Sequence, residues 1–301
     1  MKSKLSLCLA FLATCTLATA TVQGSFQRTF QVSGPVNMEV LTRSGDISVH
    51  TGAAGSVIVS GKIHVGDRWF AGNRQSDVNE LEKNPPVRQS GDAINIDYVN
   101  KSDIAIDYEI TVPADTTLRT HSGSGDQAID GLNTSLELEA GSGDLRLSNL
   151  TGGMKLHTGS GNMDGHDVSG PITAEAGSGD VRLETKGGDA RVHTGSGNIE
   201  LRGVSGGLWI EAGSGDVSVE GAQKATWEVR TGSGNVDLRL PGNAGYQLEA
   251  STGSGRVVVD RPITMTVQGD LERSHHAING QVGSGGPKLI VHTGSGDVNI
   301  R

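Results

Sequence analysis

The sequence predicts an all-β protein: a single parallel β-solenoid with about 18 residues per coil and a short helix or loop inserted near the N-terminus. The first observation is a four-residue signal, GSGD or GSGN, that returns from Gly123 to Gly232 at steps of 18, 18, 18, 18, 18 and 19 residues. Such a period is typical of stacked units that are each covered by their neighbours. The second is a period-2 apolar pattern within each repeat, and the third is a set of charges that alternate from repeat to repeat.

One repeat, Gly141 to Thr158, shows how a coil would be built. Numbered from its first glycine, positions 5, 7, 14 and 16 are apolar, and positions 6, 8, 15 and 17 are polar. This alternation is typical of two half-buried strands. The GSG step and the pair Gly152-Gly153 would supply the turns, because glycine reaches positive φ without a steric cost. The unit leaves no room for a helix.

Four positions of the repeat carry alternating side chains. In an 18-residue coil, residues one repeat apart lie about 4.8 Å apart in a parallel ladder, where opposite charges attract and like charges repel. The columns are position 4 (Asp144, Asn162, Asp180, Asn198, Asp216, Asn235), position 6 (Arg146, Asp164, Arg182, Glu200), position 8 (Glu184, Arg202, Glu220, Arg239, Asp260) and position 17 (Glu139, His157, Glu175, His193, Glu211, Arg230). We therefore expect the columns to fix the register and to create a super-repeat of two coils.

Residues 1–20 are expected to form a secretory signal peptide. Lys2 and Lys4 precede a short apolar core, and Ala18-Thr19-Ala20 fits the small-x-small cleavage rule, so the mature chain would begin at Thr21. The mature protein would then be exported to the periplasm, to the cell surface or out of the cell, without a transmembrane segment. Acylation at Cys15, giving a lipoprotein, is the less favoured alternative. Both cysteines lie in this segment, so no disulfide is expected.

The remainder is expected to be one continuous domain, residues 25–301, with irregular N-terminal coils (21–122) followed by the regular GSGD/N array (123–301). Asp77 and Glu80 predict a capping box for a helix over 77–83 within an insertion at 66–86, which would cover the first coils. Residues 288–301 are expected to close the solenoid as its last coil. The expected early strands are 36–41, 47–50, 57–65, 93–98 and 104–112.

Charge excludes some partners. Removal of the leader takes the formal charge from −9 to −11, and no basic run remains. Binding to nucleic acid needs clustered Lys and Arg to neutralise phosphates, so nucleic acid is not an expected partner, and neither is an anionic membrane surface. No motif indicates a cofactor.

Several stretches resemble one bacterial family. They are SGDISV at Ser44, Asn84-Pro85-Pro86, Ile110-Thr111-Val112-Pro113, the serial TGSGD/N coils, Leu240-Pro241 and the closing GGPKLIVHTGSGDVNI. Together they are similar to the exported β-strand-repeat family described as putative adhesins, domain of unknown function 4097. The resemblance covers residues 25–301 and is most specific at the closing stretch. It implies a parallel β-helix-like fold and an envelope location, and it brings no catalytic motif.

Two places in the sequence carry side chains that could bind a metal ion. The aspartates of GSGD do not follow the calcium nonapeptide pattern, and Asn in alternate coils halves the carboxylates available to a hard cation; a turn Asp or Asn bonding its own backbone is the preferred interpretation. The position-17 column offers imidazoles and carboxylates, which zinc or copper could use. His157 and His193 would be about 9.6 Å apart, too far to share an ion. No metal site is predicted; the residual candidates are Glu139, His157, Glu175, His193 and Glu211.

Catalysis on a β-helix would require a carboxylate cluster for polysaccharide cleavage. The candidates are Asp97, Asp103, Asp107, Glu109 and the pair His166-Asp167. None pairs an acid with a base or nucleophile at a recognisable spacing, so no enzyme is predicted.

Two functions remain. The favoured one is a non-catalytic, exported cell-envelope solenoid that acts as an adhesin-like scaffold or binding surface for a cell-surface glycan or another envelope protein. The alternative is a carbohydrate-active or glycan-binding β-helix protein, for which Trp209 and Trp227 in neighbouring coils are the hint.

Overall fold

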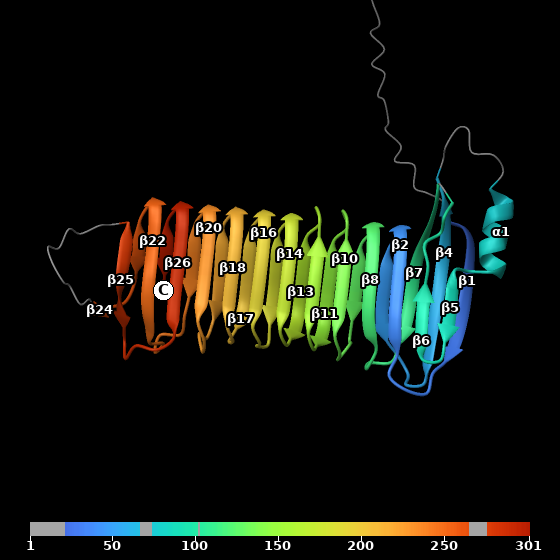
Figure 1. Ribbon diagram of the computed structural model, residues 1–301, viewed down its shortest axis with the longest axis horizontal. Coiled ribbons are helices and arrows are strands. Elements are labelled where there is room, and N and C mark those ends of the chain that lie inside the picture. Colours follow the sequence, from blue (N-terminus) through green and yellow to red (C-terminus); the bar gives the residue numbers. More distant parts are fainter. Residues whose placement is uncertain (1–21, 67–73, 102, 265–275) are drawn as a thin grey trace, which may run out of the picture.

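The computed structural model describes residues 22–66, 74–101, 103–264 and 276–301, which form two long sheets packed face to face around one core (Figure 1). The predicted signal peptide, its cleavage site and Cys15 lie outside the described residues. Each regular coil contributes one strand to each sheet. The predicted all-β solenoid is therefore confirmed.

We call the thirteen-stranded sheet sheet A. In spatial order it contains β1 (Val22–Gln31), β4 (Ser56–Val65), β7 (Ile104–Val112), β3 (Ile47–Thr51), β9 (Gln127–Asp130), β11 (Leu145–Thr151), β13 (Met163–Ser169), β15 (Val181–Thr185), β17 (Ile199–Val204), β19 (Val217–Gly221), β21 (Val236–Arg239), β27 (Val298–Ile300) and β23 (Val257–Val259).

The fourteen-stranded sheet is sheet B. Taken from the same end of the molecule, it contains β5 (Val87–Ser90), β6 (Ala93–Ile96), β2 (Asn37–Ser44), β8 (Thr117–Ser124), β10 (Leu136–Ala140), β12 (Met154–Thr158), β14 (Ile172–Ser178), β16 (Ala190–Ser196), β18 (Leu208–Ser214), β20 (Trp227–Ser233), β26 (Lys288–Ser295), β22 (Tyr246–Ser254), β25 (Ala277–Val282) and β24 (Ile263–Thr264).

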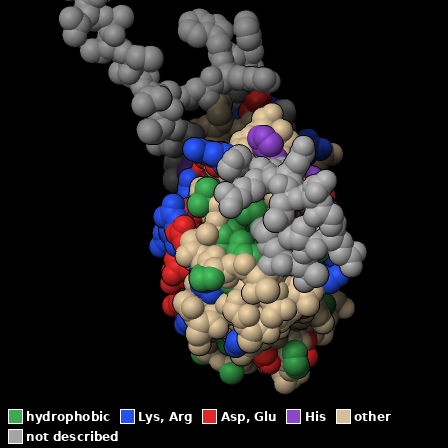
Figure 2. Space-filling view, turned by 90° about the vertical axis from the view of Figure 1, so that its left-hand side faces the viewer, with side chains coloured by type: hydrophobic (Ala, Val, Ile, Leu, Met, Phe, Trp, Pro, Cys, Tyr) green, Lys and Arg blue, Asp and Glu red, His purple; other side chains and the backbone are tan. Residues whose placement is uncertain are grey.

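The repeats pair as the 18-residue period predicts. Leu145 lies beside Met163 and Met154 beside Ile172, on parallel neighbouring strands. The inward positions are buried along the whole array, and charged side chains alternate with them on the outside. Seen from the end formed by β22 to β25, hydrophobic side chains lie near the centre and charged ones on the flank (Figure 2). Apolar burial between the two sheets is thus the main stabilising term.

The order of the coils departs from the expectation at both ends. The coil of β2 and β3 lies between the β6/β7 strands and the β8/β9 coil. The coil of β26 and β27, expected to close the solenoid, lies between the β20/β21 coil and the β22/β23 coil. Several pairings near the ends are antiparallel: β1 with β4, β4 with β7, β5 with β6, and β25 with both β22 and β24. At the far edge of sheet A, β23 pairs in parallel with β27. The spatial order of the strands thus differs from their sequence order at both ends.

The predicted helix is present as α1 (Gln75–Lys83), but the expected capping box is wrong. The N-cap is Arg74, which makes no side-chain capping bond, and Asp77 pairs instead with Arg74 and with Lys101, whose Nζ lies 2.7 Å from Asp77 Oδ1. Val78 and Leu81 are buried, and the helix packs on β1, the edge strand of sheet A. It therefore covers that edge, as expected for the insertion. Among the described residues, no helix is long and apolar enough to span a membrane.

The GSG corners stack backbone on backbone. A Cβ added to Gly159 would lie 2.4 Å from the carbonyl oxygen of Gly141, and one added to Gly161 would lie 1.9 Å from that of Gly143. Thr158, buried beside this corner, donates its hydroxyl to Gly143 O and accepts the Gly161 N–H. Close approach, more than positive φ, is therefore the reason that both corner positions are glycine.

Candidate functional surfaces

Position 4 of the repeat forms a continuous ladder of hydrogen bonds between coils. The side-chain oxygen of each Asp or Asn accepts the backbone N–H of the position-4 residue in the next coil: Asp144 Oδ1 accepts from Asn162 N at 2.8 Å, and Asn162 Oδ1 accepts from Asp180 N at 3.0 Å. We call this series the Asx ladder. In spatial order its members are Asp107, Asp46, Asp126, Asp144, Asn162, Asp180, Asn198, Asp216, Asn235 and Asp297. The interpretation that each turn residue bonds its own backbone is therefore wrong, because the acceptor serves the neighbouring coil.

Asp and Asn have different roles in the Asx ladder. The Asn162 amide also donates to Asp144 Oδ1, which an aspartate could not do. At Asp126 and Asp144, two aspartates that follow each other in the regular array, the Arg146 guanidinium lies between them, 2.8 Å from Asp126 Oδ2 and 3.2 Å from Asp144 Oδ2. In the regular array, alternation with a neutral amide, or a guanidinium in its place, thus reduces the repulsion between stacked carboxylates.

Two carboxyls at the start of the regular array have lowered pKa values. Partial burial would raise the pKa of Asp126, but the Asp144 N–H and the Arg146 guanidinium outweigh it and lower the pKa. The pKa of Asp130 is lowered by hydrogen bonds from Ser148 and Asn149. A folded-state pKa below the unfolded value gives stability that is present above the unfolded pKa and is lost as the pH falls through the folded one.

We therefore expect the urea midpoint to fall as the pH is lowered below about 4, the usual range of free aspartate. Asp126→Asn should flatten this dependence, because the amide keeps an oxygen for the Asp144 N–H and no longer titrates. Urea titrations between about pH 2 and pH 6 measure both. A wild-type midpoint that is constant over this range would contradict the expectation.

On the outer face of sheet A, charges neutralise one another within single strands. Arg202 pairs with Glu200 at 2.5 Å on β17, and Arg239 pairs with Asp237 at 3.3 Å on β21. Along the ladder, Arg182 lies 3.8 Å from Asp164. Positions 6 and 8 thus carry opposite signs in the same coil.

On the outer face of sheet B, the position-17 column lies in the predicted register. Glu139 is beside His157, which is beside Glu175, followed by His193, Glu211 and Arg230. Sequence reasoning missed the extension of the column by His121 and His292, which pair with Glu139 and Arg230 in the same ladder. No group of three ligating side chains that could hold a metal ion occurs in the described part of the chain.

A second column on sheet B, at position 15, was not predicted. Arg119 pairs with Glu137 at 2.7 Å, and the Arg191 guanidinium lies 5.2 Å from the centre of the Trp209 ring. Between them Lys155 makes no ion pair or hydrogen bond with any described residue. The alternation of apolar and polar residues marks these positions as outward, so the column was visible in the sequence.

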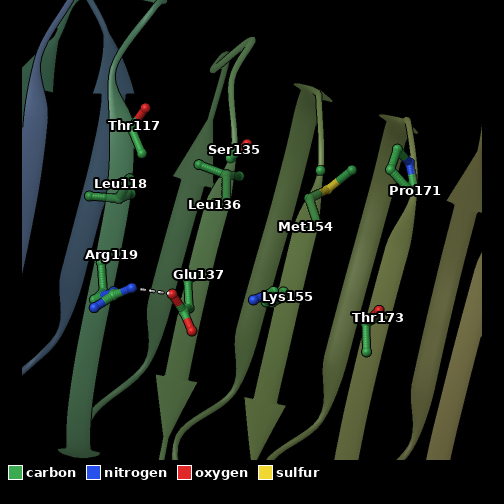
Figure 3. A pocket seen from close by; sticks show the side chains of 11 residues that line it. Thr117, Leu118, Arg119, Ser135, Leu136, Glu137, Met154, Lys155, Pro171 and Thr173 are labelled. Atoms are coloured by element: carbon green, nitrogen blue, oxygen red, sulfur yellow. Dashed lines mark hydrogen bonds and ion pairs between the residues drawn. The ribbon is translucent and has the colours of Figure 1, made fainter.

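Shallow hollows lie along this face. One, of about 410 Å³, is lined by Arg119, Glu137 and Lys155 together with Ser135 (Figure 3). Gly153, which has no side chain, also lines it and leaves space. A second, of about 360 Å³, shares Glu137 and Lys155 and extends to the position-17 column. Sheet B therefore has a continuous charged and hollowed surface.

The double variant His157→Glu and His193→Glu tests the position-17 column. It would stack five carboxylates from Glu139 to Glu211, adding four like-charge neighbours at about 0.2–1 kcal/mol each. We expect a lower melting temperature at low salt and recovery at high salt, because screening weakens surface repulsion.

Leu156→Ala is the control for that variant. Leu156 is buried, so its truncation should cost about 2–5 kcal/mol with little dependence on salt. If the double variant melts like the wild type at low salt, the column does not contribute to register.

The candidate catalytic residues are dispersed. Asp97, just after β6, pairs with Arg88, and Glu109 on β7 lies 4.0 Å from Lys62. His166 Nδ1 lies 3.5 Å from Glu184, and Asp167 pairs with Lys186 at 3.1 Å.

Asp103 and Asp107 both lie near His64. Asp107 Oδ2 is 2.7 Å from His64 Nε2, and its other oxygen accepts the Asp46 N–H at the start of the Asx ladder. Asp103, with φ of 66°, lines a hollow of about 390 Å³ together with His64 and Lys101. The Arg74 guanidinium lies 3.9 Å from Asp103 Oδ2.

The two tryptophans do not share a face. Trp227 is fully buried and donates Nε1–H to Gly206 O, whereas Trp209 points outward from β18 under Arg191. Both are at position 15 counted from the preceding GSG, but the extra residue in the 19-residue repeat shifts Trp227 into the inward register of Leu208. The hint of an aromatic glycan platform is therefore wrong.

Comparison with known proteins gives the family. Solved structures similar to the chain include one described as a putative adhesin from Bacteroides fragilis NCTC 9343, at 14% identity and TM-score 0.40, covering 93% of this chain and 98% of that one. Another is described as a putative cell adhesion protein from Clostridium sporogenes ATCC 15579, at 15% identity and TM-score 0.19, covering 92% and 98%. No curated protein matches the chain. The model of the Toastrack DUF4097 family matches residues 37–191 and 185–301, and the chain belongs to that family.

Proposed function

We propose that this protein is a non-catalytic, adhesin-like scaffold of the cell envelope that presents the outer faces of its two sheets as binding surfaces. The observation that carries the proposal is that ladders of side chains run across both faces and hold the coils in one register, from Asp107 to Asp297 in the Asx ladder alone. Such ladders make a long, stiff body, because their side chains hold neighbouring coils together. The family membership supports the same function, and the predicted signal peptide supports export.

The arrangement of the candidate acids supports a role without turnover. Hydrolysis of a glycosidic bond needs two carboxyl groups about 5–9.5 Å apart on either side of the substrate. Asp97, Glu109 and Asp167 are each engaged by a cation. Asp107 is engaged by His64 and a backbone N–H.

We expect no release of reducing ends or unsaturated products when the purified protein is incubated with acidic polysaccharides. Asp103→Asn and His166→Ala are the matched variants, since each alters a candidate acid or base on the outside of the fold. Turnover by the wild type that either variant abolishes, with the far-UV CD spectrum unchanged, would refute the proposal.

Binding and location are tested separately. The protein should be recovered from the periplasmic, surface or secreted fraction of its cells, and recovery from the cytoplasm would contradict export. Immobilised protein should retain a glycan or an envelope protein without modifying it, and a glycan array with an envelope-protein panel measures this.

A further inference from the structure

The two outer faces distribute their charges differently. On sheet A, residues two apart on one strand carry opposite charges and cancel, as Glu200 and Arg202 do. On sheet B, from β8 to β18, no strand carries opposite charges at these two positions: alternate strands carry basic or acidic side chains, with Thr173 and Trp209 uncharged. The six pairs, in spatial order, are Arg119 with His121, Glu137 with Glu139, Lys155 with His157, Thr173 with Glu175, Arg191 with His193, and Trp209 with Glu211. We call these pairs bands, alternately basic and acidic.

Register alone does not require the bands. Alternation down the position-15 and position-17 columns would fix the register equally well if each strand carried one positive and one negative side chain. Positions 6 and 8 of sheet A have that arrangement. Putting like charges side by side on one strand costs some repulsion within the chain and leaves each coil of sheet B with a net outward charge. The difference between the sheets indicates that the bands of sheet B face something outside the chain.

The bands are complementary to themselves. The banded region has six strands, and a two-fold axis along the strand direction between β12 and β14 places each basic band on an acidic band of a second copy. Glu137 then faces Arg191, Glu139 faces His193, and His157 faces Glu175. His121 likewise faces Glu211, and Arg119 faces the Trp209 ring, where a guanidinium is attracted to the aromatic face. Lys155 faces Thr173.

We propose that the outer face of sheet B, from β8 to β18, is a self-association surface that takes a second copy of this chain, face to face, with the solenoid axes antiparallel. The proposal goes beyond the scaffold function and holds whatever the scaffold binds. A closed two-fold contact of this kind is isologous, so every complementary pair occurs twice.

The opposite arrangement is excluded by the same bands. A two-fold axis along the solenoid would place each band on itself, with Lys155 facing His157 and Glu137 facing Glu139, and would bring like charges together. The charge pattern therefore selects one orientation.

The shape of the surface agrees with the proposed orientation. The hollow of about 410 Å³ lies beside Arg119, where Ser135 and Gly153 leave space. The proposed axis carries Trp209, an outward-pointing aromatic residue of the banded region, to Arg119 of the second copy. A large aromatic side chain is thus placed near a hollow on the face, and Trp and Arg are residue types enriched at the centres of interfaces.

The test is a charge swap followed by sedimentation equilibrium of the full chain at low and high salt. Wild type should form dimers at low salt and dissociate as salt is raised, because screening weakens surface ion pairs. Arg191→Glu and Glu137→Arg should each weaken the homodimer about ten-fold or more, since each turns two attractive contacts into repulsive ones. Mixing the two single variants should restore dimers, because in the mixed dimer residues 137 and 191 again carry opposite charges at both contacts.

Two controls keep the test decisive. Arg191→Glu has uncharged column neighbours, Thr173 and Trp209, so its fold should survive, which CD and thermal melting check. Arg202→Glu makes the same change on the outer face of sheet A and should leave association unchanged. A wild type that stays monomeric at low salt would overturn the proposal, and so would single variants that associate like wild type or a mixture that does not recover.

Discussion

Removal of residues 287–301 is expected to unfold the part of the solenoid beyond β20 and β21. The coil of β26 and β27 lies between two other coils, so its loss leaves both of them with an unpaired edge. Four aliphatic side chains, Leu289, Val291, Val298 and Ile300, leave the core with it, at about 1.5–3 kcal/mol each. That sum is comparable with the whole stability of a typical domain. Thermal melting and limited proteolysis should show early loss of the β22 to β25 region.

Excision of residues 159–194 is the matched control. It removes two complete repeats and joins Thr158 to Gly195, which keeps the GSG spacing, the Asp–Asn alternation and the position-17 alternation. Stability in a stacked array is close to a sum of coils and their interfaces, so this longer deletion should leave a folded, shorter solenoid. If the excision unfolds the protein while the truncation does not, the coil order described here is wrong.

Gly161→Ala is expected to lower the free energy of unfolding by about 3 kcal/mol, the upper end of overpacking effects. The added Cβ would lie 1.9 Å from the Gly143 carbonyl oxygen, and the contact is with backbone, which cannot rotate away. Two adjoining coils would have to separate at the corner to make room. Urea denaturation measures the loss.

Gly242→Ala and Gly153→Ala serve as controls for this substitution. A Cβ at Gly242 meets nothing within 4 Å, and one at Gly153 meets only Ser135 Oγ, at 3.9 Å. Both should change stability by less than about 0.5 kcal/mol, as surface substitutions commonly do. Equal effects at Gly161 and Gly242 would show that the corner has room for a methyl group.

The regular array could be predicted from the sequence because one period determined the strands, the buried positions and the partners together. Each column that was 18 residues apart in the chain became a ladder in space, as Leu145 and Met163 show. The same period placed the residues of the position-17 column side by side, as predicted.

The order of the strands at the two ends of the solenoid could not be predicted, because the alternating pattern of a strand does not determine which strand pairs with it. Val40, Leu289 and Val298 are buried in alternating strands like any others, and their partners lie tens of residues away in the sequence.

The function of the Asx ladder was missed for a different reason. Asp and Asn accept hydrogen bonds equally well from their own turn or from the next coil, and only the stacking distance decides between the two.

The position of β26 and β27 has a consequence for biogenesis. These strands are synthesised after β22 and β23, yet they separate β22 and β23 from β20 and β21. The native pairing therefore cannot be built one coil at a time in the order in which residues leave the ribosome or cross a membrane. The coil of β22 and β23 must remain open until residues 288–300 arrive, and closing over so long a separation is slow. The pairing of β22 and β23 with the rest of the solenoid is therefore a late step, which follows the pairing of the regular array.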